Sequence, residues 1–225
     1  MNSFLKGSIG TLALFVLSEI GYRMYLRWKN RSLKSTDKSE SRKDGDVMEV
    51  FFFPDKEIPC KVHFLSETRC FKDSCKYSHR KTSLSELYRY LGSCRRSMDV
   101  CVFVMTCVDL ADIVVSMRQR GVAVRVITDD EQEKITGSQI WRLRKEGICV
   151  RTDHSSNFMH HKFVVVDDQL LINGSFNWTR NAITGNQENV IVTNHTRVVG
   201  AFKAEFEKLW EQFDPKNHFE SKLNA

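Results

Sequence analysis

The sequence lacks an apolar run of the length that a membrane-spanning helix normally needs, which is about 20 mainly apolar residues. Its most apolar stretch, residues 4–22, is interrupted by Lys6 and Glu19, and only the twelve residues 7–18 between them are uncharged. The sequence also lacks an A-x-A pattern of small residues before Arg23, and this absence argues against a cleaved secretory signal. A core helix and a weak membrane anchor remain as interpretations of this end of the chain.

The charges around that stretch favour the anchor. Lys6 alone precedes it, and four basic residues follow it: Arg23, Arg27, Lys29 and Arg31. The positive-inside rule then keeps the C-terminal bulk of the chain in the cytosol. A short, modestly hydrophobic anchor with a basic trailing flank is typical of mitochondrial outer-membrane proteins. We therefore expect residues 1–28 to be a single-pass transmembrane signal anchor in that membrane. A core helix is disfavoured because the stretch leads into a polar segment and not into a domain.

An excess of acidic residues is also absent. The 225 residues carry 34 Lys+Arg against 28 Asp+Glu, a net charge of +6, which favours a polyanionic partner, either nucleic acid or anionic lipid. With 41% hydrophobic and 28% charged residues, the composition is that of a globular domain with an appendage. Residues 29–46 are rich in Ser, Lys, Asp and Glu without an apolar period. We expect a solvated polar linker there and a polar tail over residues 214–225.

Alternating strand and helix patterns predict an α/β domain over residues 47–213, in which helices sandwich a β-sheet. Ser83 is expected to be the N-cap of the first helix, with Glu86 completing a capping box, and Gly121 and Gly147 are expected to end the next two. Strands are expected at 47–53, 99–105, 122–127, 148–151 and 189–193, and helices at 83–96, 110–120, 132–145 and 196–213.

A hairpin lies between the last two of these strands. Residues 163–166 are β-branched and aromatic and predict a buried strand, 167–169 predict a turn, and 170–172 predict the return strand. His160 and Lys162 are two residues apart at the start of this hairpin, so their side chains share one face. His161 falls on the opposite face, where we expect it to be packed or hydrogen-bonded and not catalytic.

The far end of the hairpin supplies neutral donors. Gly174 permits a close approach of the backbone, and Ser175 and Asn177 follow it. A histidine, a lysine and hydroxyl or amide donors that converge on one point suit a phosphoryl group, because they stabilise charge on its non-bridging oxygens. An imidazole can also attack phosphorus covalently.

Read as a pattern, the run is His160-x-Lys162, four residues, Asp167, six residues, and Gly174-Ser175-x-Asn177. It resembles the signature of the phospholipase D superfamily, H-x-K-x4-D-x6-G-S-x-N, at every fixed position. The resemblance implies the phospholipase D fold, a phosphohistidine intermediate on His160 and no catalytic metal.

The resemblance also assigns the other site residues. It implies that Lys162 and Asn177 bind the phosphate and that Ser175 helps them. Asp167 belongs to the same catalytic signature, and we expect it to fix the hairpin. Glu188 sits where the family often places a carboxylate that orients the histidine.

Four residues ahead of the helix at 83–96 predict a metal site. They are spaced C-x9-C-x4-C-x3-H, close to the CCCH zinc-finger spacing: Cys60, Cys70, Cys75 and His79. Three thiolates and an imidazole can close a tetrahedral structural Zn²⁺ site. His63 is a rival ligand, because Cys60 and His63 could also pair. Unpaired cytosolic thiols are the alternative, and a disulfide conflicts with the expected cytosolic side.

CCCH knuckles often accompany RNA binding, where aromatics such as Phe71 and Tyr77 would stack on bases. The competing interpretation is that both rings form the small core of the knuckle.

The signature occurs only once, so one chain supplies half of a site. Together with the anchor, the CCCH-like insertion and the compact length, this resembles the mitochondrial members of the superfamily. The resemblance implies a homodimer at the mitochondrial outer membrane in which two His160 residues face each other. One attacks phosphorus, and its partner acts as general acid and then as base. The implied substrates are single-stranded RNA, cut to leave 5′-phosphates in piRNA biogenesis, or cardiolipin, hydrolysed to phosphatidic acid. The zinc knuckle and the net charge favour RNA.

Overall fold

The computed structural model describes residues 21–25, 45–66 and 68–217. The chain divides into two compact units, Met1–Gly45 and Asp46–Ala225. In the first unit, residues 21–25 are helical. The rest of the expected anchor at 1–28, nearly all of the expected linker and residues 218–225 of the expected tail lie outside the described residues. Within the described part of the chain, no helix is long and apolar enough to cross a membrane.

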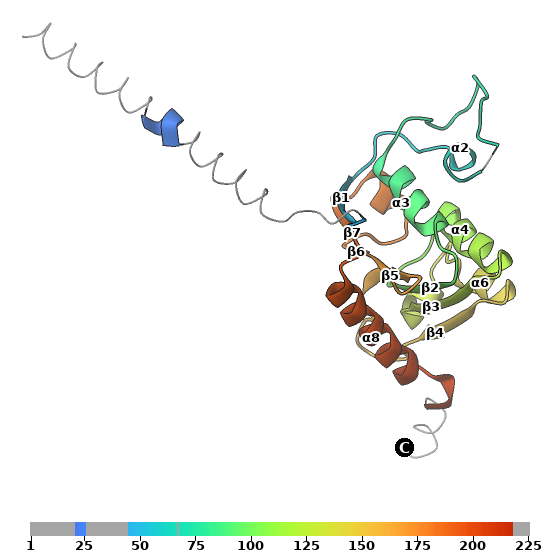
Figure 1. Cartoon of the computed structure of the whole chain (residues 1–225). Coiled ribbons are helices and arrows are strands. Elements are labelled where there is room, and N and C mark those ends of the chain that lie inside the picture. The colour runs from blue at the N-terminus through green and yellow to red at the C-terminus, as the bar shows by residue number, and fades with distance from the viewer. Residues whose placement is uncertain (1–20, 26–44, 67, 218–225) are drawn as a thin grey trace, which may run out of the picture. The chain divides into compact units, whose positions relative to one another are not determined.

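The second unit is built on a mixed sheet of seven strands in the order β1-β7-β6-β5-β2-β3-β4 (Figure 1). Strands β2, β3 and β4 are parallel, and every other neighbouring pair is antiparallel. The expected α/β class and each expected strand are confirmed, with ends that move by up to three residues. The strands are β1 (Met48–Phe53), β2 (Ser97–Val102), β3 (Ala123–Thr128), β4 (Cys149–Thr152), β5 (Lys162–Val166), β6 (Leu170–Gly174) and β7 (Glu188–Thr193).

The helices show two departures from the expected pattern. Two short helices, α2 and α7, were not predicted. The prediction of one helix over residues 132–145 is wrong. Two helices replace it, because Gly137 turns the chain at φ +85 and the Asp129 carboxylate starts the first by accepting the amides of Glu131 and Gln132. The helices are α2 (Lys61–Leu65), α3 (Ser83–Gly92), α4 (Val108–Gln119), α5 (Asp130–Glu133), α6 (Ile140–Lys145), α7 (Arg180–Thr184) and α8 (Thr196–Gln212).

The cap of α3 also differs from the prediction. Thr82, and not Ser83, is the N-cap, and Ser85 completes the capping box in place of Glu86. The Ser85 amide donates to the Thr82 hydroxyl at 3.2 Å, and the Ser85 hydroxyl accepts from the Thr82 amide at 2.8 Å. The Asp55 carboxylate accepts the next two amides, Ser83 and Leu84. The four free amides of the first turn therefore have partners that a local pattern did not identify.

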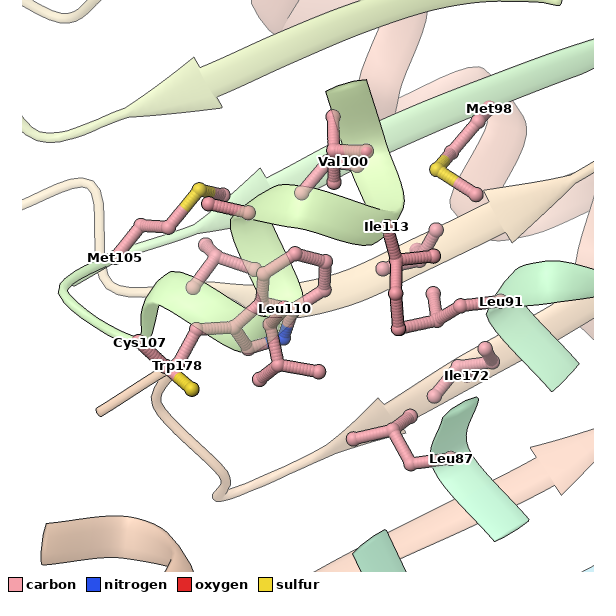
Figure 2. Close-up of a cluster of buried hydrophobic side chains, with 14 of the residues drawn as sticks. Leu87, Leu91, Met98, Val100, Met105, Cys107, Leu110, Ile113, Ile172 and Trp178 are labelled. Carbon is pink, nitrogen blue, oxygen red and sulfur yellow. The ribbon is translucent and has the colours of Figure 1, made fainter. Parts of the chain in front are cut away.

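Two hydrophobic cores lie on the two faces of the sheet. Helices α3, α4 and α6 cover one face, and α8 covers part of the other (Figure 1). The alternation along β5 divides its side chains accordingly: Val164 and Val166 belong to the first core, and Phe163 and Val165 to the second. Figure 2 shows the first core, where Leu87 and Leu91 of α3 and Leu110 and Ile113 of α4 meet strand residues that include Val100 and Ile172.

One edge of the sheet gathers the residues of interest. The parallel strands β2, β3 and β4 end there, and because β5 runs against β2, β5 begins at that edge. By the same antiparallel pairing, β6 ends there, β7 begins there and β1 ends there. In open α/β sheets this carboxyl edge is the usual place of a ligand site.

Candidate active site and metal centre

The start of β5 carries His160 and Lys162 on one side of the strand. Lys162 is opposite Val102 of β2, and the Phe103 amide donates to the His161 carbonyl at 2.9 Å, which fixes the register. The Phe103 ring lies 4.7 Å from the His160 ring, and the Lys162 ammonium lies 5.1 Å from the centre of the same ring. The Lys162 Nζ atom also donates to the His160 carbonyl at 2.6 Å. The two groups therefore sit side by side on an aromatic support.

The surroundings of Lys162 tune its charge. Burial lowers the pKa of this lysine, and the nearby Glu188 carboxylate acts in the opposite direction without outweighing burial. A partly desolvated ammonium interacts with a phosphate oxygen more strongly than one surrounded by water.

The end of β6 brings Gly174, Ser175 and Asn177 to the same edge. A Cβ atom on Gly174 would lie 2.0 Å from the carbonyl oxygen of Asn189 on β7, so the predicted close approach is confirmed. The Ser175 amide donates to that same carbonyl at 3.1 Å. The side-chain oxygen of Asn177 is buried and makes no hydrogen bond within the described residues. This oxygen is thus not committed to a partner among the described residues.

Glu188 opens β7 next to these residues. Its two carboxylate oxygens accept hydrogen bonds from the Ser175 hydroxyl and, at 2.9 Å, from the side-chain amide of Asn186. Glu188 therefore holds Ser175 in place within the chain. Its expected role in orienting the histidine stays a prediction.

Asp167 lies at the opposite end of β5, away from the gathered side chains. Its carboxylate accepts the backbone amides of Arg95, Arg96 and Ser97 at 2.7 to 3.0 Å, where the chain leaves α3 and enters β2. These bonds end α3 at Gly92, so the helix does not reach 96 as expected. Burial raises the pKa of Asp167, but the three amides outweigh it and hold the pKa below its usual value. The side chain fixes the hairpin, and within the described residues none of its hydrogen bonds reaches the edge that carries His160 and Lys162.

His161 points to the other face of the sheet, as its position in the strand predicts. Its ring packs edge-on against Phe163 at 5.5 Å and lies 3.8 Å from the Glu205 carboxylate on α8. Burial lowers the pKa of this imidazole.

Two residues at this edge were not identified from the sequence. Phe103 follows β2 and supports both His160 and Lys162. Asp129 is buried at the end of β3, and its second carboxylate oxygen accepts the Met159 amide at 3.2 Å, next to His160. Their only local signal is that each lies within two residues of the end of a predicted strand.

The cysteine-rich segment folds so that its four predicted ligands meet. Pro59 and Ser78 form a β-bridge, with the Cys60 amide donating to the Ser78 carbonyl at 2.8 Å, and this brings Cys60 beside His79. A turn closed by the Cys75 amide and the Lys72 carbonyl, 3.1 Å apart, brings Cys75 back towards Cys70.

The resulting cluster fits a metal ion. One ligand atom from each of four residues lies within 4.8 Å of all the others, and the residues are Cys60, Cys70, Cys75 and His79. The Nε2 atom of His79 is buried and has no hydrogen-bond partner among the described residues, as expected of an atom placed for a metal. The backbone amide of Lys72 lowers the pKa of Cys70, whereas burial raises the pKa of Cys60. Three thiolates and an imidazole at this spacing are a ligand set that Zn²⁺ binds in proteins.

His63, the rival ligand, lies outside this cluster. Its ring stacks on His79 with 4.4 Å between ring centres, and its Nδ1 atom lies 3.1 Å from the Cys70 carbonyl. It therefore supports two ligands from outside. Phe71 and Tyr77 are exposed, by 79% and 54%, so they do not form a core for the segment.

Comparisons with known proteins agree with this geometry. A family model described as "Cardiolipin synthase, PLD-like domain" matches residues 87–210. The chain is 45% identical over 169 residues to a protein of Chlamydomonas reinhardtii named "Mitochondrial cardiolipin hydrolase", covering 75% of each chain. Proteins of that name from Danio rerio and Homo sapiens are 41% and 40% identical, over 93% and 86% of this chain and 87% and 76% of theirs.

Among solved structures, Nuc from Salmonella typhimurium, a phospholipase D family member, superposes with a TM-score of 0.59 at 22% identity, covering 75% of this chain and 97% of that one. This likeness concerns the fold alone. Taken with the family match and the relatives, it shows that the chain belongs to the phospholipase D-like superfamily, as a phosphodiester hydrolase homologous to the mitochondrial cardiolipin hydrolases.

Proposed function

We propose that this hydrolase works through a covalent phosphohistidine on His160, in an active site completed by a second copy of the chain. The observation that carries the proposal is the single set of His160, Lys162 and Asn177 at one edge of the sheet, with His160 exposed to solvent. One such set holds one imidazole, whereas the reaction needs both a nucleophile and a proton donor.

The residues divide the reaction between them. His160 of one copy attacks phosphorus, so a nitrogen–phosphorus bond forms while the bond to the leaving oxygen breaks. His160 of the second copy gives its proton to that oxygen. It then takes a proton from water, which attacks phosphorus and breaks the nitrogen–phosphorus bond. Lys162 and Asn177 hold the phosphoryl oxygens throughout, and Ser175 is kept in place by Glu188.

An uncovered part of the sheet supports pairing with a second copy. Phe163, Asn173, Ile191 and Val50 are opposite one another on β5, β6, β7 and β1, and so they share one face. Helix α8 covers Phe163 and leaves Ile191 and Val50 exposed. The next residue on this face of β1, Phe52, is 70% exposed and lies at the catalytic edge. An apolar strip that leads to the half site is a fitting surface for a two-fold interface.

The proposed substrate is single-stranded RNA, cut endonucleolytically to leave 5′-phosphates, as in piRNA biogenesis at the cytosolic face of the mitochondrial outer membrane. The net charge of +6 and the exposed Phe71 and Tyr77 support this choice. The names of the relatives and the basic flank after residue 22 support the mitochondrial location.

A second candidate function is hydrolysis of cardiolipin to phosphatidic acid. It is favoured by the printed name of the relatives, "Mitochondrial cardiolipin hydrolase". The same chemistry applies, because a phosphatidyl group would then occupy His160.

We also propose that the metal of the cysteine cluster is structural Zn²⁺. Three thiolates and one imidazole fill a tetrahedral shell and leave no open position for a substrate. The role of these residues is to hold the segment between β1 and α3 in one conformation.

The experiment that tests the function offers labelled single-stranded RNA and cardiolipin vesicles to the purified chain in parallel, with EDTA present and with His160→Asn as control. We expect RNA cleavage to 5′-phosphate ends that survives EDTA and disappears in the variant. Hydrolysis of the lipid alone would reverse the ranking of the two candidates. Full residual turnover by His160→Asn would refute the phosphohistidine mechanism.

A further inference from the structure

Three residues that precede and begin β5 share one side of the chain. Phe158 and His160 both pack on the Phe103 ring, at 5.4 Å and 4.7 Å between ring centres, and the Lys162 ammonium lies 5.1 Å from the same centre. This period of two is that of an extended segment. The intervening Met159 turns the other way, into the second core. Phe158 therefore stands next to the nucleophile on the same surface.

The position of Phe158 is fixed although its ring is open to solvent. The ring is 60% exposed, yet the Met159 amide beside it donates to the buried Asp129 carboxylate at 3.2 Å. The backbone at Phe158 is therefore anchored, while the ring itself is open to solvent. Such a ring offers a flat apolar surface at a set distance from the phosphate-binding groups.

We propose that Phe158, supported from below by Phe103, is the stacking platform for the nucleobase attached to the scissile phosphate. The inference rests on the proposed function and names the part of a single-stranded nucleic acid that the site recognises. Aromatic stacking is tolerant of base identity, so the platform gives strand recognition without sequence preference.

The surroundings favour a base over an acyl chain. A base needs one exposed ring face, whereas an acyl chain needs a continuous apolar groove. The residues that lead to Phe158 are polar: Asp153, His154, Ser155, Ser156 and Asn157. The ring is thus an isolated apolar surface between a polar loop and a cationic site.

The test compares Phe158→Leu, which keeps apolar bulk without a ring, with Phe158→Tyr, which keeps the ring. Trp141→Leu is the control, because Trp141 is also exposed, by 66%, but lies on α6 against Arg144. Each variant cleaves oligouridylate and the same oligonucleotide with one abasic ribose. We expect Phe158→Leu to raise KM about tenfold with little change in kcat, since stacking on one base contributes about that factor. We expect Phe158→Tyr and Trp141→Leu to match the wild type.

The abasic substrate identifies the contact. In the wild type we expect cleavage beside the abasic position to fall about tenfold. In Phe158→Leu we expect no further fall at that position, because the ring and the base are the two halves of one stacking contact, which the substitution has already removed. If the missing base slowed cleavage by the wild type and by Phe158→Leu equally, the proposed stacking platform would be overturned. A loss of activity in Phe158→Leu that is seen only with cardiolipin vesicles would overturn it as well.

A binding measurement separates this inference from the proposed function. Fluorescence anisotropy of labelled oligouridylate is recorded in the His160→Asn background, with and without Phe158→Leu. About tenfold weaker binding supports the platform even where the wild type cleaves no RNA, and unchanged binding overturns it even where cleavage is efficient.

Discussion

Substitution of Gly174 by alanine should disable the enzyme by moving one strand. The added Cβ atom would lie 2.0 Å from the Asn189 carbonyl oxygen, and ordinary van der Waals contact begins near 3.4 Å. Strand β7 must then move by more than 1 Å at its catalytic end, by the difference between these two distances. Overpacking of this kind costs about 1–3 kcal/mol of folding free energy. The shift also separates Glu188 from Ser175, and a misplacement of about 1 Å at an active site costs about 100-fold in rate.

The matched control is Gly200→Ala. Gly200 lies within α8, and a Cβ atom there meets nothing within 4 Å. Alanine should stabilise that helix by about 0.5–1 kcal/mol, because glycine is a poor helix former. Urea unfolding monitored by circular dichroism gives the free energies, and phosphodiester hydrolysis by the same preparations gives the rates. A Gly174→Ala protein with wild-type activity and stability would refute the reasoning.

Three further outcomes are expected. Asp167→Asn should cost about 2 kcal/mol of unfolding free energy at pH 7, because a charged acceptor of three amides is lost. Since the folded-state pKa of Asp167 is lowered, this contribution is complete above about pH 4 and is lost as the pH falls through the folded-state value. Unfolding curves across that range would show the wild type and the variant converging in acid, and a constant difference would contradict the assignment. Cys70→Ala should release the metal, which elemental analysis would detect, and unchanged zinc content would rule out the site. Arg125→Ala should lower the free energy of unfolding by about 3 kcal/mol, measured by thermal or urea unfolding, because Asp99, which is 2% exposed, keeps only Lys203 as a charged partner among the described residues. A loss below about 1 kcal/mol would show that Lys203 alone is enough to stabilise the buried Asp99 carboxylate.

The features that could be predicted from the sequence are those that neighbouring residues decide. The hairpin of β5 and β6 follows from its β-branched and aromatic residues and from the Asp167–Asp168 turn, where both residues adopt positive φ. The metal ligands follow from their spacing. The close approach at Gly174 follows from the need for a residue without a Cβ atom.

The features that were missed depend on residues far apart in the sequence. The end of α3 is set by the Asp167 carboxylate, and the cap of α3 is reinforced by Asp55, so neither boundary is a property of the helix alone. Phe103 becomes a support for His160 only because β2 pairs with β5. Its own surroundings in the sequence indicate only a buried strand.

The central claim is that two chains share one active site, each supplying a His160. Wild-type and His160→Asn chains with different tags are co-expressed in equal amounts, and the total dimer pool is assayed for phosphodiester hydrolysis. Random pairing makes about one quarter of the dimers fully wild type, so we expect about one quarter of the activity of an equal amount of wild-type protein. About one half of that activity would mean that each chain works alone, and would contradict the account.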